Sequence, residues 1–266
     1  MRKYFQIFKT HWQSSFIYRL NFIMWRVRTI LQFFGVYFLW LAIFINQDTV
    51  FDYSKSVMLT YVIGTAILRS FVFSSRSVSV GVEIANGDLN NYLVKPLSYL
   101  KNWLARDLAD KLLNIVFLTI ELFLIVLIIK PPIIAPTSFF HLMVFFFAVI
   151  LAMMMYFLFS FLISSFTFWY PEHDGWPLRF FIFMIIEFLA GGLFPLDILP
   201  KLAFKIFRFL PPAYLAFYPI QIYLGRLDFN QIVSTILIML AWLLVLYKLS
   251  RIVWKKGLKI YGAYGR

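Results

Sequence analysis

Residues 142–170 read LMVFFFAVILAMMMYFLFSFLISSFTFWY, a stretch that contains no Asp, Glu, Lys or Arg. A helix that crosses the hydrocarbon core of a bilayer needs about 20 consecutive apolar residues. Lipid offers no partner for an unpaired backbone N–H or C=O group, so such a segment crosses the membrane as a helix. The stretch therefore predicts a transmembrane helix, and similar charge-poor segments recur from residue 20 to residue 254.

The composition agrees with lipid as the main solvent of this chain. Of its 266 residues, 62% are hydrophobic and 21% are aromatic, and the mean hydropathy is +0.81. Soluble domains average about 45–50% apolar residues. The sequence predicts an all-α polytopic membrane protein with six transmembrane helices at 29–46, 56–77, 112–130, 140–168, 178–195 and 232–252.

The formal net charge of +13 could suggest a nucleic-acid partner. The basic residues, however, flank the apolar segments as membrane anchors do, so we expect contact with the lipid bilayer and none with nucleic acid. With six spans, most Lys and Arg residues fall on the side that also carries both termini. This asymmetry predicts that both termini lie in the cytoplasm.

The first 28 residues are basic and rich in aromatic side chains. Phe5, Phe8, Trp12 and Phe16 recur at spacings of three or four residues, which favours an amphipathic helix on the inner leaflet. The alternative is that residues 1–28 are the water-exposed start of a long, tilted first span.

The longest inner loop, 78–111, follows spans one and two, which occupy 29–77. Within it, 82–97 predicts a short helix or turn that is punctuated by Gly87 and closed by Pro96. Apolar and polar residues alternate here, and a short amphipathic helix of this kind can dock into a groove of a partner. The segment could equally lie on its own helix bundle.

Spans three to five occupy 112–195, and the outer segment 196–231 separates them from the last span. Apolar residues form one helical face of its first half, and Lys201, Lys205 and Arg208 form the other. Prolines divide the segment, which predicts short re-entrant or interfacial helices whose charged groups reach water. A seventh span is the alternative. A basic tail, 253–266, follows the last span.

Two motifs resemble the type-2 ABC permeases, the six-span membrane subunits (half-transporters) of ATP-binding-cassette exporters. The first, E-I-x-x-G-D-L followed by L-x-K-P-L, is formed by Glu83, Ile84, Gly87, Asp88, Leu89, Leu93, Lys95, Pro96 and Leu97. The second, G-G-L-F-P-L-D-x-x-P, includes Gly191, Gly192, Phe194, Pro195, Asp197 and Pro200. The tail, with Lys256, Gly257, Tyr261 and Ala263, is also similar to the end of small members of this family.

The resemblance implies a single transmembrane domain over 1–266 in the cytoplasmic (inner) membrane of a prokaryote. Two permease subunits, identical or different, would pair around a transport pathway, and each would sit on a separate ATPase subunit. The 83–97 segment would be the coupling helix that receives motion from the ATPase. Residues 1–28 would be the amphipathic connecting helix.

The sequence contains no G-x-x-x-x-G-K-[ST] motif, so the phosphate-cradling loop of an ATPase is missing. We therefore expect ATP and Mg to be bound by the partner subunit, and neither a cofactor nor a catalytic group in this chain. The absence of cysteine excludes thiol catalysis and Cys-ligated zinc, and the scattered histidines predict no metal site. The competing function is a secondary transporter or channel that works without an ATPase.

Three ionisable residues are predicted at membrane depth: Glu121, Glu187 and Arg69. Such groups are costly in lipid and usually face a bundle interior or an aqueous cavity. The two acids could contact a substrate or a proton in the pathway, or they could make structural hydrogen bonds to neighbouring helices. Arg69 could pair with a carboxylate or extend toward the inner interface.

Overall fold

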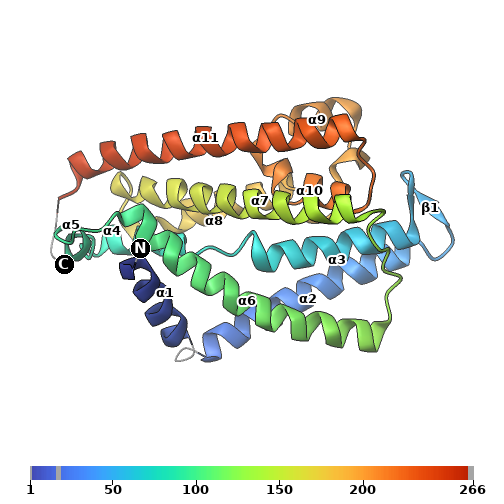
Figure 1. Ribbon diagram of the computed structural model, residues 1–266, viewed down its shortest axis with the longest axis horizontal. Coiled ribbons are helices and arrows are strands. Elements are labelled where there is room, and N and C mark those ends of the chain that lie inside the picture. Colours follow the sequence, from blue (N-terminus) through green and yellow to red (C-terminus); the bar gives the residue numbers. More distant parts are fainter. Residues whose placement is uncertain (1, 16–18, 263–266) are drawn as a thin grey trace.

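The apolar run around residues 142–170 forms the central helix α7 (Phe139–Ser165), which begins where the Ser138 hydroxyl accepts a hydrogen bond from the His141 backbone N–H. The computed structural model describes residues 2–15 and 19–262. The last helix, α11 (Phe229–Ile260), lies along α7 and makes with it the most extensive contact between two helices (Figure 1). Ala148, Ala152 and Ser160 of α7 are fully buried, and such small residues let neighbouring helices approach closely.

Within the described residues, four helices are long and apolar enough to cross a membrane. They are Arg26–Ile43 of α2 (Arg19–Ile43), α6 (Tyr99–Ile129), α7 with its 3₁₀ extension η2 (Phe166–Phe168), and α11. A fifth is possible if α3 (Lys55–Phe71) and the segment Arg76–Ala85 count as one span bent by 43°. The structure therefore confirms the all-α, multi-pass character, and the count of six spans stays a prediction.

The predicted span 178–195 is shorter in the structure. It corresponds to α8 (Trp176–Leu189), which has 14 residues and follows the 3₁₀ turn η3 (Glu172–Gly175). The helix ends before Gly191, whose φ of 79° lies in the left-handed region that only glycine adopts readily. Residues 190–195 therefore turn away from the helix axis and do not extend it.

The predicted amphipathic helix over 1–28 is divided into two elements. Helix α1 covers Arg2–Ser15 and packs against α6, whereas Arg19–Arg28 already belongs to the transmembrane helix α2. The reason is that the apolar residues after Arg19 continue directly into the first span. Residues 1 and 16–18, with Phe16 of the predicted stripe, lie outside the described part, as do residues 263–266 of the tail.

The predicted inner loop also ends earlier than expected. After the 3₁₀ turn η1 (Arg76–Ser79) it forms two short helices, α4 (Val80–Ala85) and α5 (Asn90–Leu93). Residues 99–111, predicted as loop, are the first turns of α6, and Tyr99, Trp103, Ala105 and Ala109 in these turns are buried against the rest of the molecule. Helix α6 thus extends well beyond the apolar part of the third span.

The opposite end of the molecule carries a small hairpin that the sequence did not predict. Strands β1 (Thr49–Val50) and β2 (Tyr53–Ser54) pair antiparallel around Phe51 and Asp52, both with positive φ. The segment after α8 forms short helices at this end, as expected for 196–231. They are η4 (Leu196–Ile198), α9 (Lys201–Phe207), η5 (Pro211–Tyr214) and α10 (Phe217–Tyr223).

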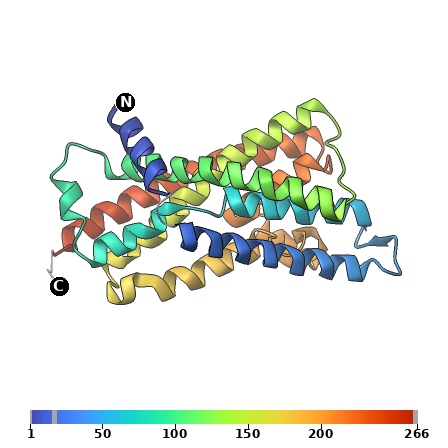
Figure 2. The same cartoon turned by 90° about the horizontal axis from the view of Figure 1, so that it is seen from below.

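The molecule is elongated, with different functional segments at its two ends. Helices α1, α4 and α5 gather near both chain termini, at what we call the terminal end (Figure 1). The β-hairpin, α9 and α10 lie at the other, the hairpin end, and the second view shows the same separation (Figure 2). The long helices connect the two ends.

Candidate functional site

We call residues 83–97 the coupling segment, after the role that their motif predicts. It consists of the end of α4, a turn and α5, and the turn depends on Gly87, whose φ is 80°. Ile84 and Leu89 are buried in the main hydrophobic core. Leu93 and Val94, in contrast, are 47% and 84% exposed. The segment therefore has an inner face fixed to the bundle and an apolar tip at the surface.

Glu83 attaches the coupling segment to the start of α6. Its carboxylate accepts a hydrogen bond from the Tyr99 hydroxyl at 2.6 Å and forms an ion pair with Arg106 at 3.2 Å. Arg106 also donates to the Tyr92 hydroxyl at 2.6 Å and lies over the Trp103 ring. Because both short helices are held by the same arginine, the coupling segment and the first turns of α6 form one connected unit.

A second set of contacts holds α4 from its other side. Helix α4 packs against η2 and η3, the turns that join α7 to α8. Gly81 lies directly against the Arg179 guanidinium, which in turn donates to the Asp174 carbonyl and the Thr167 hydroxyl. This packing is not predictable from the sequence, where Arg179 is one of several basic residues that flank the apolar segments.

The remaining motif residues of the coupling segment lie at the surface. Asp88, Lys95 and Pro96 are exposed, whereas Leu97 is half-buried. The Lys3 ammonium of α1 donates to the Pro96 carbonyl at 2.6 Å, and the Ser98 N–H donates to the Tyr4 hydroxyl at 3.1 Å. The N-terminal helix thus contacts the end of the coupling segment.

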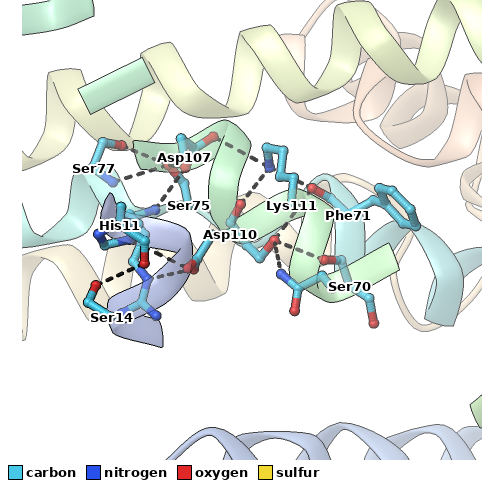
Figure 3. A network of polar contacts seen from close by, with 12 residues as sticks. His11, Ser14, Ser70, Phe71, Ser75, Ser77, Asp107, Asp110 and Lys111 are labelled. Carbon is cyan, nitrogen blue, oxygen red and sulfur yellow. Dashed lines mark hydrogen bonds and ion pairs between the residues drawn. The ribbon is translucent and has the colours of Figure 1, made fainter. Parts of the chain in front are cut away.

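A buried polar network joins α6 to the break between α3 and η1 (Figure 3). Asp107 accepts hydrogen bonds from the Ser75 hydroxyl and the Arg76 backbone N–H at 2.7 and 2.8 Å. Lys111, one helical turn further on, donates to the Phe71 and Ser74 carbonyls at 2.6 and 2.7 Å. Neither residue belongs to one of the two sequence motifs, although their spacing of four places them on one face of a helix.

The three ionisable residues predicted at membrane depth are paired in the structure. Arg69 of α3 forms an ion pair with Glu187 of α8 and donates to the Gln32 side chain of α2 at 2.9 Å. Glu121 of α6 accepts two hydrogen bonds from Arg26 of α2, each 2.6 Å long. Arg26 falls within residues 1–28, which the sequence predicts as an amphipathic helix, so the sequence does not predict its ion pair with Glu121.

The glycine-rich motif begins directly after α8 and contacts α2 and α3. The Tyr61 hydroxyl donates to the Gly191 carbonyl at 2.7 Å, and the Trp40 indole N–H donates to the Leu193 carbonyl at 3.1 Å. A Cβ at Gly192 would lie 3.0 Å from the Glu187 carbonyl, so the chain approaches itself closely here. Phe194 packs edge-on against Phe188.

Asp197 is the centre of a second polar cluster at this end. It accepts a hydrogen bond from the Tyr53 hydroxyl, and it lies 3.8 Å from the Arg226 guanidinium, which stacks over the Tyr53 ring. Gln221 of α10 donates to the same hydroxyl. Burial raises the pKa of Asp197, while Tyr53 and Arg226 act in the opposite direction. Pro195 and Pro200 flank η4, immediately before η4 and α9 begin.

Among residues 2–15 and 19–262, no group of three or more His, Asp or Glu side chains is placed to hold a metal ion. The described geometry offers ion pairs, helix caps and an exposed apolar tip. These contacts pack the helices together, and the fold that carries them is that of a multi-pass helical membrane protein.

A comparison with models of protein families identifies the family of this multi-pass membrane protein. The family model described as "ABC-2 family transporter protein" matches residues 30–265, and the chain therefore belongs to the ABC-2 family. The resemblance drawn from the two motifs is thereby confirmed. Members of this family are typically non-catalytic membrane subunits, and membership implies an ABC ATPase as a partner. A comparison with curated protein sequences returned no match.

Proposed function

We propose that this chain is the permease subunit of an ATP-binding-cassette exporter. It forms half of the translocation pathway and is driven by a separate ATPase through the coupling segment. The observation that supports this most directly is the two-sided nature of that segment in an ABC-2 chain. Ile84 and Leu89 fix it to the bundle, while Leu93 and Val94 remain at the surface. A segment that transmits motion from a partner needs one face that is held by the helix bundle and another that is free to contact the partner.

The free side has the chemistry of a protein-docking surface. Two exposed apolar residues stand beside charged and amide groups, and an amphipathic short helix of this kind fits a groove of a partner. An open hollow adjoins the tip and is lined by Glu83, Asp88, Asn91, Tyr92, Val94 and Lys95. Val94, the most exposed of these apolar residues, is the variable position of the L-x-K-P-L half of the motif and is not among the predicted site residues.

The remaining parts of the proposal concern the second subunit, the cargo and the orientation in the membrane. A second permease subunit, identical or different, would complete the pathway, and the ATPase would bind ATP and Mg. The many Phe and Met residues suit an amphiphilic or lipid-like cargo. Both termini would lie in the cytoplasm, beside the ATPase. In this proposal, the Arg–Glu pairs at Glu121 and Glu187 hold helices together.

The test is purification of the tagged full-length chain from its native membranes in mild detergent, followed by identification of stoichiometric companions. We expect an ATPase. Val94→Asp should reduce its recovery about tenfold, which corresponds to about 1.4 kcal/mol of binding free energy. The matched control is Leu202→Asp, since Leu202 is also apolar and is 73% exposed but belongs to α9 at the hairpin end.

A different result would favour the competing function. If no ATPase is recovered and the purified chain alone moves cargo along an ion gradient, the protein is a secondary transporter or channel. Equal recovery of the ATPase with Val94→Asp and Leu202→Asp would instead refute the docking role of the tip.

A further inference from the structure

The connection between the coupling segment and the membrane helices contains a mechanical weak point. Helix α3 ends at Phe71, η1 begins at Arg76, and the two directions differ by 43°. No continuous helical hydrogen-bond ladder crosses residues 72–75, and a broken helix bends more easily than an intact one. A push on α4 would therefore be absorbed at this break unless another element made it stiff.

The side chains of α6 provide that stiffness by capping both ends of the break. The Lys111 ammonium donates to the carbonyls of Phe71 and Ser74, at the C-terminal end of α3. The Asp107 carboxylate accepts from the Arg76 N–H and the Ser75 hydroxyl, at the N-terminal end of η1. Each charge has the sign that the adjacent helix end attracts, because carbonyl ends attract cations and N–H ends attract anions.

Burial makes these caps strong. The Asp107 and Lys111 side chains are 1% and 4% exposed, and their charged atoms lie 3.6 Å apart. Water can neither screen nor replace the contacts, so the loss of one partner leaves a buried charge and unsatisfied backbone groups.

The capping residues belong to a longer polar stripe on α6, at positions i, i+3, i+4 and i+7. Asp110 pairs with the Arg76 side chain and, at 3.7 Å, with His11 of α1. Asn114 donates to the Ser74 hydroxyl at 3.2 Å. The same helix holds the coupling segment at Tyr99, about two turns before Asp107, and at Arg106, the residue next to Asp107. Helix α6 therefore contacts both sides of the break and the segment that would move it.

We propose that Asp107 and Lys111 are positioning residues that lock the α3–η1 break, so that displacement of the coupling segment is transmitted to α3. This inference rests on the proposed function, because it assumes an ATPase that moves the coupling segment. The pair touches neither the ATPase nor the cargo. Its effect is on transmission, so its loss should separate ATPase binding from the movement of α3.

The test uses the absence of cysteine from the chain. A single cysteine is placed at the exposed Lys55, where α3 begins at the hairpin end, and its maleimide labelling rate is measured with and without MgATP in the purified complex. In the otherwise unchanged chain, MgATP should change the rate. Asp107→Asn and Lys111→Met should abolish that change while the ATPase stays bound. The matched controls Asp48→Asn and Lys101→Met, at exposed positions outside the network, should keep it.

Two further variants separate capping from a simple ion pair. Lys111→Arg keeps a cation at the carbonyls of α3 and should retain part of the response. The double exchange Asp107→Lys with Lys111→Asp restores opposite charges but places each beside the wrong helix end, so the response should stay lost. Full recovery in the double exchange would overturn the capping role.

The remaining outcomes are also decisive. If the unchanged chain binds no ATPase and shows no response to MgATP, the proposed function fails and this inference falls with it. If the unchanged chain responds and Asp107→Asn and Lys111→Met respond equally, only the inference fails. Loss of ATPase binding in these variants would also contradict it, because the damage would then lie in the fold of the coupling segment.

Discussion

Arg26 of α2 and Glu121 of α6 face each other in a two-pronged ion pair, with Nε to Oε1 and Nη2 to Oε2 both at 2.6 Å. Arg69 of α3 makes a comparable contact with Glu187 of α8. Each acid predicted at membrane depth thus meets an arginine of a neighbouring helix, which compensates a charge that lipid cannot solvate. This geometry favours a structural role for both acids.

The first prediction concerns the charge compensation between Arg26 and Glu121. Arg26→Met leaves the Glu121 carboxylate uncompensated and should lower the free energy of unfolding by about 3–5 kcal/mol. The double variant Arg26→Met with Glu121→Leu removes both charges and should recover most of that loss, since an apolar pair of similar volume is often as stable. The single variant Glu121→Leu completes a double-mutant cycle. Thermal unfolding of the four proteins in detergent then measures the coupling energy between the two residues.

The same variants distinguish structure from transport. If Glu121 only holds α2 to α6, the stable double variant should still move cargo. A double variant that is as stable as the original chain but inactive would show that Glu121 contacts the cargo or a proton.

The second prediction compares two glycines. A Cβ at Gly81 would overlap the Arg179 guanidinium and lie 2.8 Å from the Thr167 hydroxyl. Gly81→Ala should therefore lower stability by about 1–3 kcal/mol, the usual cost of overpacking. Gly35, in the middle of α2, has no neighbouring atom within 4 Å of such a Cβ. Gly35→Ala should raise stability by about 0.5–1 kcal/mol, because alanine is the better helix former.

Thermal unfolding of Gly81→Ala and Gly35→Ala tests both expected changes in stability. Equal melting temperatures would show that α4 does not pack against the α7–α8 connection as the structure has it.

The third prediction concerns the hairpin end. Tyr53 is 1% exposed and connects the hairpin to Asp197 and Gln221 through its hydroxyl. Tyr53→Phe keeps the ring but removes the hydroxyl that the buried Gln221 amide and the Asp197 carboxylate contact, at a cost of about 1–3 kcal/mol. Hydrogen exchange should increase in residues 49–54 and around 197. Tyr170→Phe, at an exposed tyrosine, is the control and should leave exchange in both regions unchanged.

The parts of the fold that the sequence predicted are those with a strong local signal. The uncharged run 142–170 gives α7, and the proline-divided pattern after residue 196 gives short helices. The helix ends were less accurate, because α6 and α11 continue beyond the apolar region that defines a span. The β-hairpin was missed since strands of two residues show no detectable alternation.

The coupling role of residues 83–97, which the motif predicts, stays a prediction. The contacts that hold this segment come from distant residues such as Arg106 and Arg179, and the motif does not indicate them. A sequence cannot say that Arg26, and no other cation, meets Glu121. The polar residues from Asp107 to Asn114 have helical spacing. The sequence prediction places residues up to Lys111 in a loop, however, and therefore does not identify this polar face of α6.

The last prediction tests which end of the molecule faces the cytoplasm. The chain has no cysteine, so a single cysteine at Val94 or at Lys201, on the charged face of α9, reports one end without background. Because basic residues concentrate beside the spans at the terminal end, we expect that end to lie inside. A membrane-impermeant maleimide applied to intact cells should label Lys201→Cys, and should label Val94→Cys only after the membrane is opened. Lys101→Cys, a second exposed position at the terminal end, should behave as Val94→Cys does. The reverse pattern would place the coupling segment outside, where no ATP-driven partner could reach it, and would refute the proposed function together with the topology.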